Sequence, residues 1–141
     1  MERTFEILKK TPTLEEFTNL CSVVGLGDNI NFNVAEISLE NSVHAVLVKD
    51  NDKVIGMGRI VGDGAIYFFI QDVIVHPSYR GMGLGIEIMN SLIEYLENNA
   101  PNKAIMGLFI SKGKGTFYDK YNFEDVTPNM KGVYTVIKKC E

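Results

Sequence analysis

The chain has 141 residues, of which 45% are hydrophobic and 10% aromatic, which is enough for the core of one domain. Fourteen Lys and Arg residues against 18 Asp and Glu give a formal net charge of −4 without any block of like charges, which argues against a nucleic-acid partner. No apolar run approaches the roughly 18 residues of a membrane span, and the N-terminus lacks a secretory signal pattern, so we expect a cytoplasmic protein with no membrane partner.

The first half of the chain alternates helical and β-type patterns. Thr13 and Glu16 have the spacing of a capping box, in front of apolar residues that recur at helical intervals up to Val24. Gly56 and Gly58 interrupt a β-rich run and indicate a close approach by a neighbouring element. In chain order we expect an edge strand over residues 4–8, a helix over 14–24, a short helix over 33–40, and an antiparallel meander over 43–48, 53–61 and 65–75.

The second half begins with an amphipathic helix over residues 83–98. Its apolar residues form one stripe and its polar residues the other, so one face is expected to be buried. The apolar run 104–110 follows this crossover helix and should pair in parallel with the strand at 65–75. A short helical segment over 116–121 and a final strand near 133–138 complete what we expect to be one domain.

A glycine-rich turn, Arg80-Gly-Met-Gly-Leu-Gly85, joins the strand at 65–75 to this helix. The first turn of a helix leaves backbone N–H groups unpaired and carries a partial positive charge, so such a turn is a natural site for an anion. The turn lacks the G-x-G-x-x-G spacing of a dinucleotide site and the G-x-x-x-x-G-K of a nucleotide P-loop. These two kinds of phosphate site are therefore excluded.

Two motifs in order resemble those of the GNAT superfamily of acyl-CoA-dependent N-acyltransferases. The first is Arg-x-x-Gly-x-Gly after a strand that ends in Val-x-Val-x-Pro, with the residues Val73, Val75, Pro77, Arg80, Gly83 and Gly85. The second is Phe117-Tyr-Asp-Lys-Tyr-Asn-Phe123, in which Asn122 replaces the family's usual glycine. The resemblance implies an α+β fold, a three-layer sandwich whose mixed, mostly antiparallel sheet of about six to seven strands is flanked by about four helices.

The resemblance also implies acetyl-CoA as cosubstrate. The backbone of the strand would pair with the pantetheine arm, and the amides of the glycine turn would hold the pyrophosphate, with a guanidinium nearby. The expected cofactor-binding residues are Val73, Ile74, Val75, Arg80, Gly81, Met82, Gly83, Leu84, Gly85 and Tyr118. We expect no metal, because the chain lacks metal-ligand spacing.

Acetyl transfer to an amine requires protons to move, and two residues are candidates for this work. An alkyl ammonium with a pKa near 10.4 is neutral in only about one part in 2,500 at pH 7, so a base or a water chain would help. Tyr118, which the resemblance places beside the sulfur, is the candidate proton donor to the leaving thiolate, or else a packed aromatic. Asp72 is the candidate base, or else an anchor for the ammonium or a structural carboxylate. His44 and His76 are more typical of surface or core positions.

The predicted function is an N-acetyltransferase in which a primary amine attacks the thioester directly. The strand and loop most resemble enzymes for small-molecule amines of the arylalkylamine or amino-sugar type. At most two of Tyr67, Phe68 and Phe69 could line an aryl acceptor, because side chains alternate along a strand; otherwise they belong to the sheet core. The alternatives are a non-catalytic acyl-CoA-binding or regulatory module and an acetyltransferase for protein or peptide amines. A homodimer would form through the final strand or an exposed sheet edge.

Overall fold

The computed structural model describes residues 5–109, 119–121, 123, 124, 135 and 139. By its internal contacts the chain divides into two compact units, Met1–Phe109 and Ile110–Glu141. All helices and strands named below belong to the first unit, and the second contributes one short 3₁₀ helix, Asp119–Tyr121. The single domain stays a prediction. Among the described helices none has both the length and the apolarity needed to cross a membrane, and the cytoplasmic location stays a prediction.

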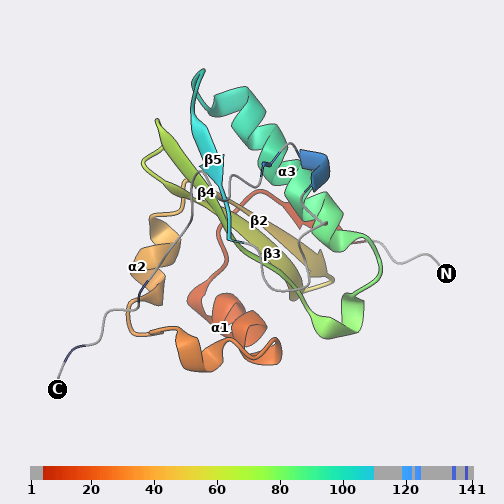
Figure 1. Cartoon of the computed structure of the whole chain (residues 1–141). Helices are drawn as coiled ribbons and strands as arrows, with labels where there is room; N and C mark the ends of the chain where they lie inside the picture. The colour runs from red at the N-terminus through yellow and green to blue at the C-terminus, as the bar shows by residue number, and fades with distance from the viewer. Residues whose placement is uncertain (1–4, 110–118, 122, 125–134, 136–138, 140–141) are drawn as a thin grey trace. The chain divides into compact units, whose positions relative to one another are not determined.

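A five-stranded sheet forms the centre of the first unit (Figure 1). Its strands, in their order across the sheet, are β1 (Glu6–Leu8), β2 (His44–Asp50), β3 (Lys53–Gly62), β4 (Tyr67–Val75) and β5 (Ile105–Gly107). Neighbouring strands are antiparallel except for β4 and β5, which are parallel. The expected meander and the parallel strand after the crossover helix are therefore confirmed.

The described residues contain five strands, whereas six to seven were expected. The expected final strand near residues 133–138 lies outside the described residues. Of the strand expected over 104–110, residue 110 lies outside the described residues, and among the others the strand comprises Ile105–Gly107. It is preceded by a turn in which Lys103 has a φ of +71° and the amide of Ala104 donates to the carbonyl of Pro101 at 3.1 Å.

Three α-helices flank the sheet, with α1 (Leu14–Val23) and α2 (Ala35–Glu40) on one face and α3 (Leu84–Asn99) on the other (Figure 1). The predicted capping box starts α1: the amide of Glu16 donates to Thr13 Oγ1 at 3.1 Å, and the amide of Thr13 donates to Glu16 Oε1 at 2.8 Å. These paired bonds satisfy donors that the first helical turn cannot. The short helix expected over 33–40 is α2.

The middle of β3 separates the two helical layers. Met57 packs in the core cluster that includes Leu20 and Cys21 of α1, and the next residue along the strand, Gly58, faces α3. A Cβ at Gly58 would lie 2.6 Å from Cγ2 of Ile88, so only a glycine leaves room for α3 at this distance. The close approach predicted from the two strand glycines is thus confirmed. It holds α3 against β3, the neighbour of the strand that leads to the N-terminus of this helix.

Candidate active site

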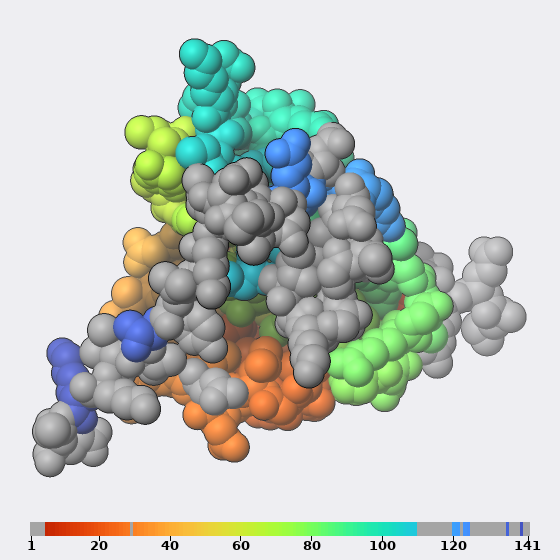
Figure 2. All heavy atoms as spheres, in the orientation of Figure 1, coloured from red at the N-terminus to blue at the C-terminus, as the bar shows by residue number. Residues whose placement is uncertain are grey.

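The turn between β4 and α3 contains a short 3₁₀ helix, Pro77–Tyr79, followed by the glycine loop, which we define as residues 80–85. Gly81 has a φ of +81° and Gly83 a φ of +79°, the left-handed region that favours glycine. A Cβ at either position would meet nothing within 4 Å, so the backbone conformation and not crowding requires glycine here. The loop, bright green in Figure 2, stands at the surface with open space around it.

The base of the glycine loop is held by side chains. Tyr79 donates its hydroxyl hydrogen to Asp50 Oδ2 at 2.5 Å, and its ring meets that of Phe5 edge-on at 5.8 Å between centroids. His76 Nδ1 accepts the amide of Ser78 at 3.1 Å. Burial lowers the pKa of His76, which favours the neutral imidazole that can accept this bond. The loop is therefore anchored at its base and open at its tip.

The start of α3 supplies backbone donors to this open space. Gly83 is the N-cap residue and provides no side-chain cap to the first amides of the helix. These amides carry the partial positive charge of the helix N-terminus, and the exposed Arg80 lies just before them in the chain. Met82 is also exposed, whereas Leu84 is buried and secures the first turn. Chemically, the glycine loop can hold a phosphate-sized anion.

In the part of the chain that the structure describes, one edge of β4 is open along most of its length. There β5 pairs with β4 only at residues 67–69. Residues 70–75 of β4 have β3 on one side, and in the described part of the chain no strand lies on their other side. Val73, Ile74 and Val75, which were predicted to bind the cofactor, belong to this stretch, and Ile74 also packs in the core. An open strand edge offers its N–H and C=O groups to an extended ligand.

A β-bulge interrupts this open stretch. Met57 lies opposite Ile74 and Arg59 opposite Gln71, so β4 has one residue more than β3 between these pairs. Asp72 lies in the bulge with a φ of +55°, which is uncommon for any residue other than glycine. The bulge changes the alternation of side chains along β4. It brings the carboxylate of Asp72 to the side of the sheet that carries α2.

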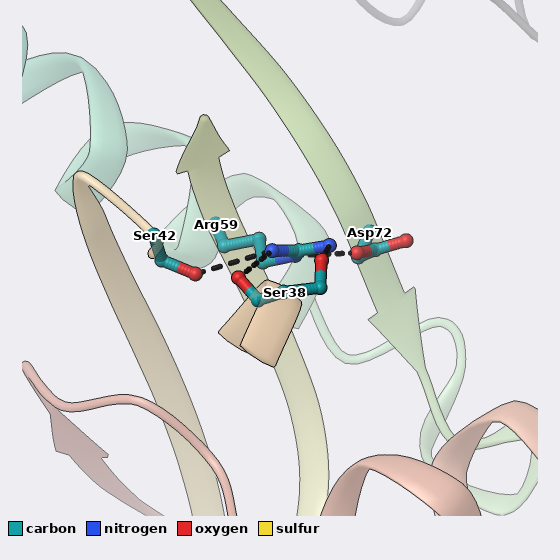
Figure 3. A network of polar contacts seen from close by, with 4 residues as sticks. All are labelled: Ser38, Ser42, Arg59 and Asp72. Carbon is teal, nitrogen blue, oxygen red and sulfur yellow. Dashed lines mark hydrogen bonds and ion pairs between the residues drawn. The ribbon is translucent and has the colours of Figure 1, made fainter. Parts of the chain in front are cut away.

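Asp72 forms an ion pair there with Arg59 of β3, a buried residue that the sequence analysis missed (Figure 3). Arg59 Nε donates to Asp72 Oδ2 at 2.6 Å. Its Nη1 donates to the carbonyl of Ser38 at 3.0 Å and to Ser42 Oγ at 3.2 Å, and its Nη2 donates to Ser38 Oγ at 3.0 Å. The signal was present in the sequence: Arg59 is the one charge in the apolar run 54–61, and a buried cation needs a partner.

Two other titratable side chains, His44 and Cys21, lie in packed surroundings that favour a structural role. His44, considered as a base, stacks on Tyr95 with 4.0 Å between ring centroids, and burial lowers its pKa. Cys21 lies near the ion pair at the inner face of α1, where burial and then the charge of Asp72 raise the pKa of its thiol to about 11. At neutral pH this thiol is therefore protonated and a poor nucleophile.

The three aromatic residues at the start of β4 divide between the two faces of the sheet. Phe68 is buried, whereas Tyr67 and Phe69 are 49% and 38% exposed. Phe69 lies opposite Val61, and Gln71 lies opposite Arg59. Because cross-strand partners share a face, Phe69 is on the same side of the sheet as the Arg59–Asp72 pair.

The second sequence motif lies largely outside the described residues. Tyr118, the candidate proton donor, is among the residues that are not described, as are Phe117 and Asn122. The position of Tyr118 relative to the open edge of β4 therefore stays a prediction. The structure does bring together the glycine loop, the open edge and Asp72, all within one strand and the turn that follows it.

Comparison with known proteins identifies the family. Residues 6–112 match the family described as Acetyltransferase (GNAT) family. An uncharacterized N-acetyltransferase, ycf52, from Pyropia yezoensis is 30% identical over 129 residues, which cover 89% of this chain and 72% of that protein. A solved Staphylococcus aureus protein of unknown function, titled "Probable Acetyltransferase", has a TM-score of 0.86 at 29% identity and covers 95% of this chain and 100% of its own. A GNAT family acetyltransferase from Streptococcus pneumoniae has a TM-score of 0.77 at 30% identity, with 96% and 100% covered. The chain thus belongs to the GNAT family and is an acetyltransferase.

Proposed function

We propose that this acetyltransferase moves an acetyl group from acetyl-CoA to a primary amine of a small molecule, of the arylalkylamine or amino-sugar type. The observation that carries the proposal is the continuity of two features. The open edge of β4, residues 70–75, leads directly into the glycine loop at the N-terminus of α3. One extended ligand with a phosphate at one end fits both.

Acetyl-CoA suits the donors present at this site. The uncapped first turn of α3 and the guanidinium of Arg80 would face its pyrophosphate, where the left-handed Gly81 and Gly83 leave the approach open. The backbone of residues 73–75 would pair with its pantetheine arm as an added strand does. Bound there, acetyl-CoA supplies the acetyl group as a thioester with a thiolate as leaving group.

Asp72 is proposed to orient the acceptor amine. Its Oδ2 is held by Arg59, and in Figure 3 its second oxygen points away from the guanidinium. The carboxylate is 20% exposed, so this second oxygen can accept an N–H of an amine at the bulge. In this role Asp72 holds the nitrogen lone pair toward the thioester. An Asp72 that acts as base instead would make Asp72→Asn lose mainly kcat, whereas loss of an orienting contact would also raise the KM of the amine.

Tyr118 is proposed as the proton donor to the leaving thiolate. The proton that the nitrogen loses when it attacks the thioester passes to water, and water returns a proton to the tyrosinate. A phenol with an ordinary pKa near 10 is protonated at neutral pH and can give its proton to a forming thiolate. Tyr118→Phe removes only the hydroxyl. We expect it to lower kcat about tenfold or more and to leave the dissociation constant of acetyl-CoA within about twofold. A Tyr118→Phe enzyme with an unchanged kcat would rule out this assignment.

The exposed aromatic face of β4 favours an acceptor with an aromatic ring. Phe69 lies on the same side of the sheet as Asp72, and three residues of strand separate them by roughly 7–10 Å. An aryl ring joined to its amine by a short alkyl arm spans a comparable distance. Phe69→Ala should therefore raise the KM of an arylalkylamine about tenfold, because the ring loses its contact surface, and should leave that of an alkylamine unchanged.

The decisive experiment is a screen of acceptors in which released thiol is measured. Purified protein with acetyl-CoA is offered arylalkylamines, amino sugars, alkyl diamines and lysine-containing peptides. Turnover of a small amine supports the proposal. Turnover of peptides alone would identify a protein or peptide acetyltransferase. Thermal stabilisation by acetyl-CoA without turnover of any amine would indicate a binding or regulatory module and overturn the proposal.

A further inference from the structure

Arg59 is the buried charge at which α2 and β4 are joined. Four of the five N–H donors of its guanidinium are used: one on Asp72, two on Ser38 and one on Ser42. Two of these bonds end on Ser38 in the last turn of α2, where a cation also complements the partial negative charge of the helix end. Within the described residues Arg59 is the only buried polar or charged side chain.

Asp72, the partner of Arg59 on β4, has an unfavourable backbone conformation. Asp72 has a φ of +55° in the bulge of β4, a conformation that side-chain-bearing residues adopt rarely. Its carboxylate is fixed by the 2.6 Å ion pair, and the guanidinium is fixed in turn by α2. A planar guanidinium with several bonds holds its partner in one orientation, which a flexible ammonium does not. Arg59 therefore stabilises the bulge as well as the helix.

The bulge that Arg59 stabilises lies beside the backbone at which the reaction is proposed to take place. Pairing between β4 and β5 ends at Phe69, and Asp72 follows three residues later on the open edge. A shift of the bulge would move the backbone of residues 73–75 and the second oxygen of Asp72 together. A shift of α2 would change the protein surface that lies beside Asp72 on the same side of the sheet.

We propose that Arg59 is a positioning residue for acetyl transfer, which fixes the bulge of β4 and the adjacent helix α2 in one arrangement. The proposal rests on the proposed function, because the reaction is placed at the open edge of β4. Arg59 does not touch the reacting atoms itself. It acts through Asp72 on the acceptor nitrogen and through the bulge on the backbone beside the thioester.

The test compares three variants in a Cys140→Ser background, which leaves Cys21 as the only thiol. Arg59→Met removes the charge and all its bonds, and Arg59→Lys keeps the charge but not the planar fork. Lys53→Met is the matched control, because Lys53 is an exposed cation at the start of the same strand. For each variant we measure kcat and KM with the best acceptor of the screen, the dissociation constant of CoA, the folded fraction at the assay temperature, and the rate at which a thiol reagent modifies Cys21.

We expect Arg59→Met to lower kcat/KM for the acceptor about tenfold or more, with the dissociation constant of CoA changed less than about threefold. Arg59→Lys should lose about threefold in kcat/KM, and Lys53→Met should match the unmutated protein. Modification of Cys21 should become about tenfold faster in Arg59→Met, because local opening on the α1 and α2 side becomes easier.

A loss of kcat/KM that only follows the unfolded fraction, or an Arg59→Lys enzyme equal to the unmutated one, would overturn the proposal. Should Arg59→Met fail to fold, Arg59→Lys decides by the same criterion. If the unmutated protein acetylates no amine, the proposed function fails. The positioning of the bulge is then tested by two measurements that need no turnover. Faster hydrogen exchange of amides 70–75 and faster modification of Cys21 in the Arg59 variants would support it, and unchanged rates would overturn it.

Discussion

Replacing Gly58 with alanine should push α3 away from the sheet. A Cβ at this position lies 2.6 Å from Cγ2 of Ile88 and 3.0 Å from Cδ1 of Leu92, whereas carbon atoms in contact stay about 3.5–4.0 Å apart. Both side chains are fully buried. Because Cγ2 branches directly from the Cβ of Ile88, it cannot withdraw without a change of rotamer or a movement of the helix.

The magnitude follows from this overlap. Overpacking of a filled core costs about 1–3 kcal/mol, and the stiffer unfolded chain of an alanine variant returns about 0.4–1 kcal/mol. We therefore expect a net loss of about 1–2 kcal/mol in the free energy of unfolding. An unfolding entropy of about 2.1 cal/mol/K per residue gives about 0.3 kcal/mol/K for 141 residues, so Tm should fall by roughly 3–7 °C.

Differential scanning calorimetry of Gly58→Ala and Gly56→Ala tests the reasoning. A Cβ at Gly56 comes no closer than 3.2 Å, to Cδ1 of Ile88, which is the flexible end of that side chain. Gly56→Ala should therefore lose less than half as much in Tm. Equal losses for the two variants, or an unchanged Tm for Gly58→Ala, would refute the argument from close packing. A displaced α3 should also weaken the binding of acetyl-CoA, which titration calorimetry on Gly58→Ala would measure.

Two more predictions concern turns. Asp63 Oδ1 accepts the amides of residues 65, 66 and 67 at 2.8–3.0 Å, and these bonds lower the pKa of its carboxyl group. The stabilisation they provide is fully present above the ordinary carboxyl pKa and is lost as the pH falls through the lower folded-state value. The Tm advantage over Asp63→Asn should therefore be largest near neutral pH and shrink in acid; an advantage independent of pH would contradict the charge argument. Gly83→Ala and Gly25→Ala both place alanine at a φ near +80° with open space around its Cβ. Both should lose about 1–2 kcal/mol of stability, but only Gly83→Ala should weaken acetyl-CoA binding, and a similar loss of affinity in Gly25→Ala would contradict the location of the phosphate site.

Features that depend on residues close together in the sequence could be predicted. The capping box of Thr13 and Glu16, the buried stripe of α3 and the close approach at Gly58 each follow from local spacing and appear in the structure. The parallel pairing of β5 followed from the connection between strands, since a strand after a crossover helix returns in the same direction. The alternation of side chains along β4 separated Phe68 from its two aromatic neighbours.

The Arg59–Asp72 pair could not be predicted, because it depends on a register that local patterns do not specify. The two residues are 13 positions apart and meet only because β4 carries one extra residue opposite Gly58. Regular alternation without a bulge gives no indication of this pairing. The sequence showed an isolated arginine in an apolar strand and a carboxylate on the next strand. It did not show that these two side chains would form an ion pair, nor that Ser38 and Ser42 would accept the remaining hydrogen bonds of the arginine.

The open edge of β4 has a consequence for the protein before any substrate arrives. Unpaired backbone groups along an apolar strand are a template for any other extended chain, including a second copy of the same strand. Under the proposed function, the cosubstrate covers this edge and also stabilises the fold, by about 2.7 kcal/mol at a concentration 100 times its dissociation constant. We therefore expect the acetyl-CoA supply to govern self-association and protease sensitivity of the protein, so that its lifetime would follow the metabolic state that also governs its activity.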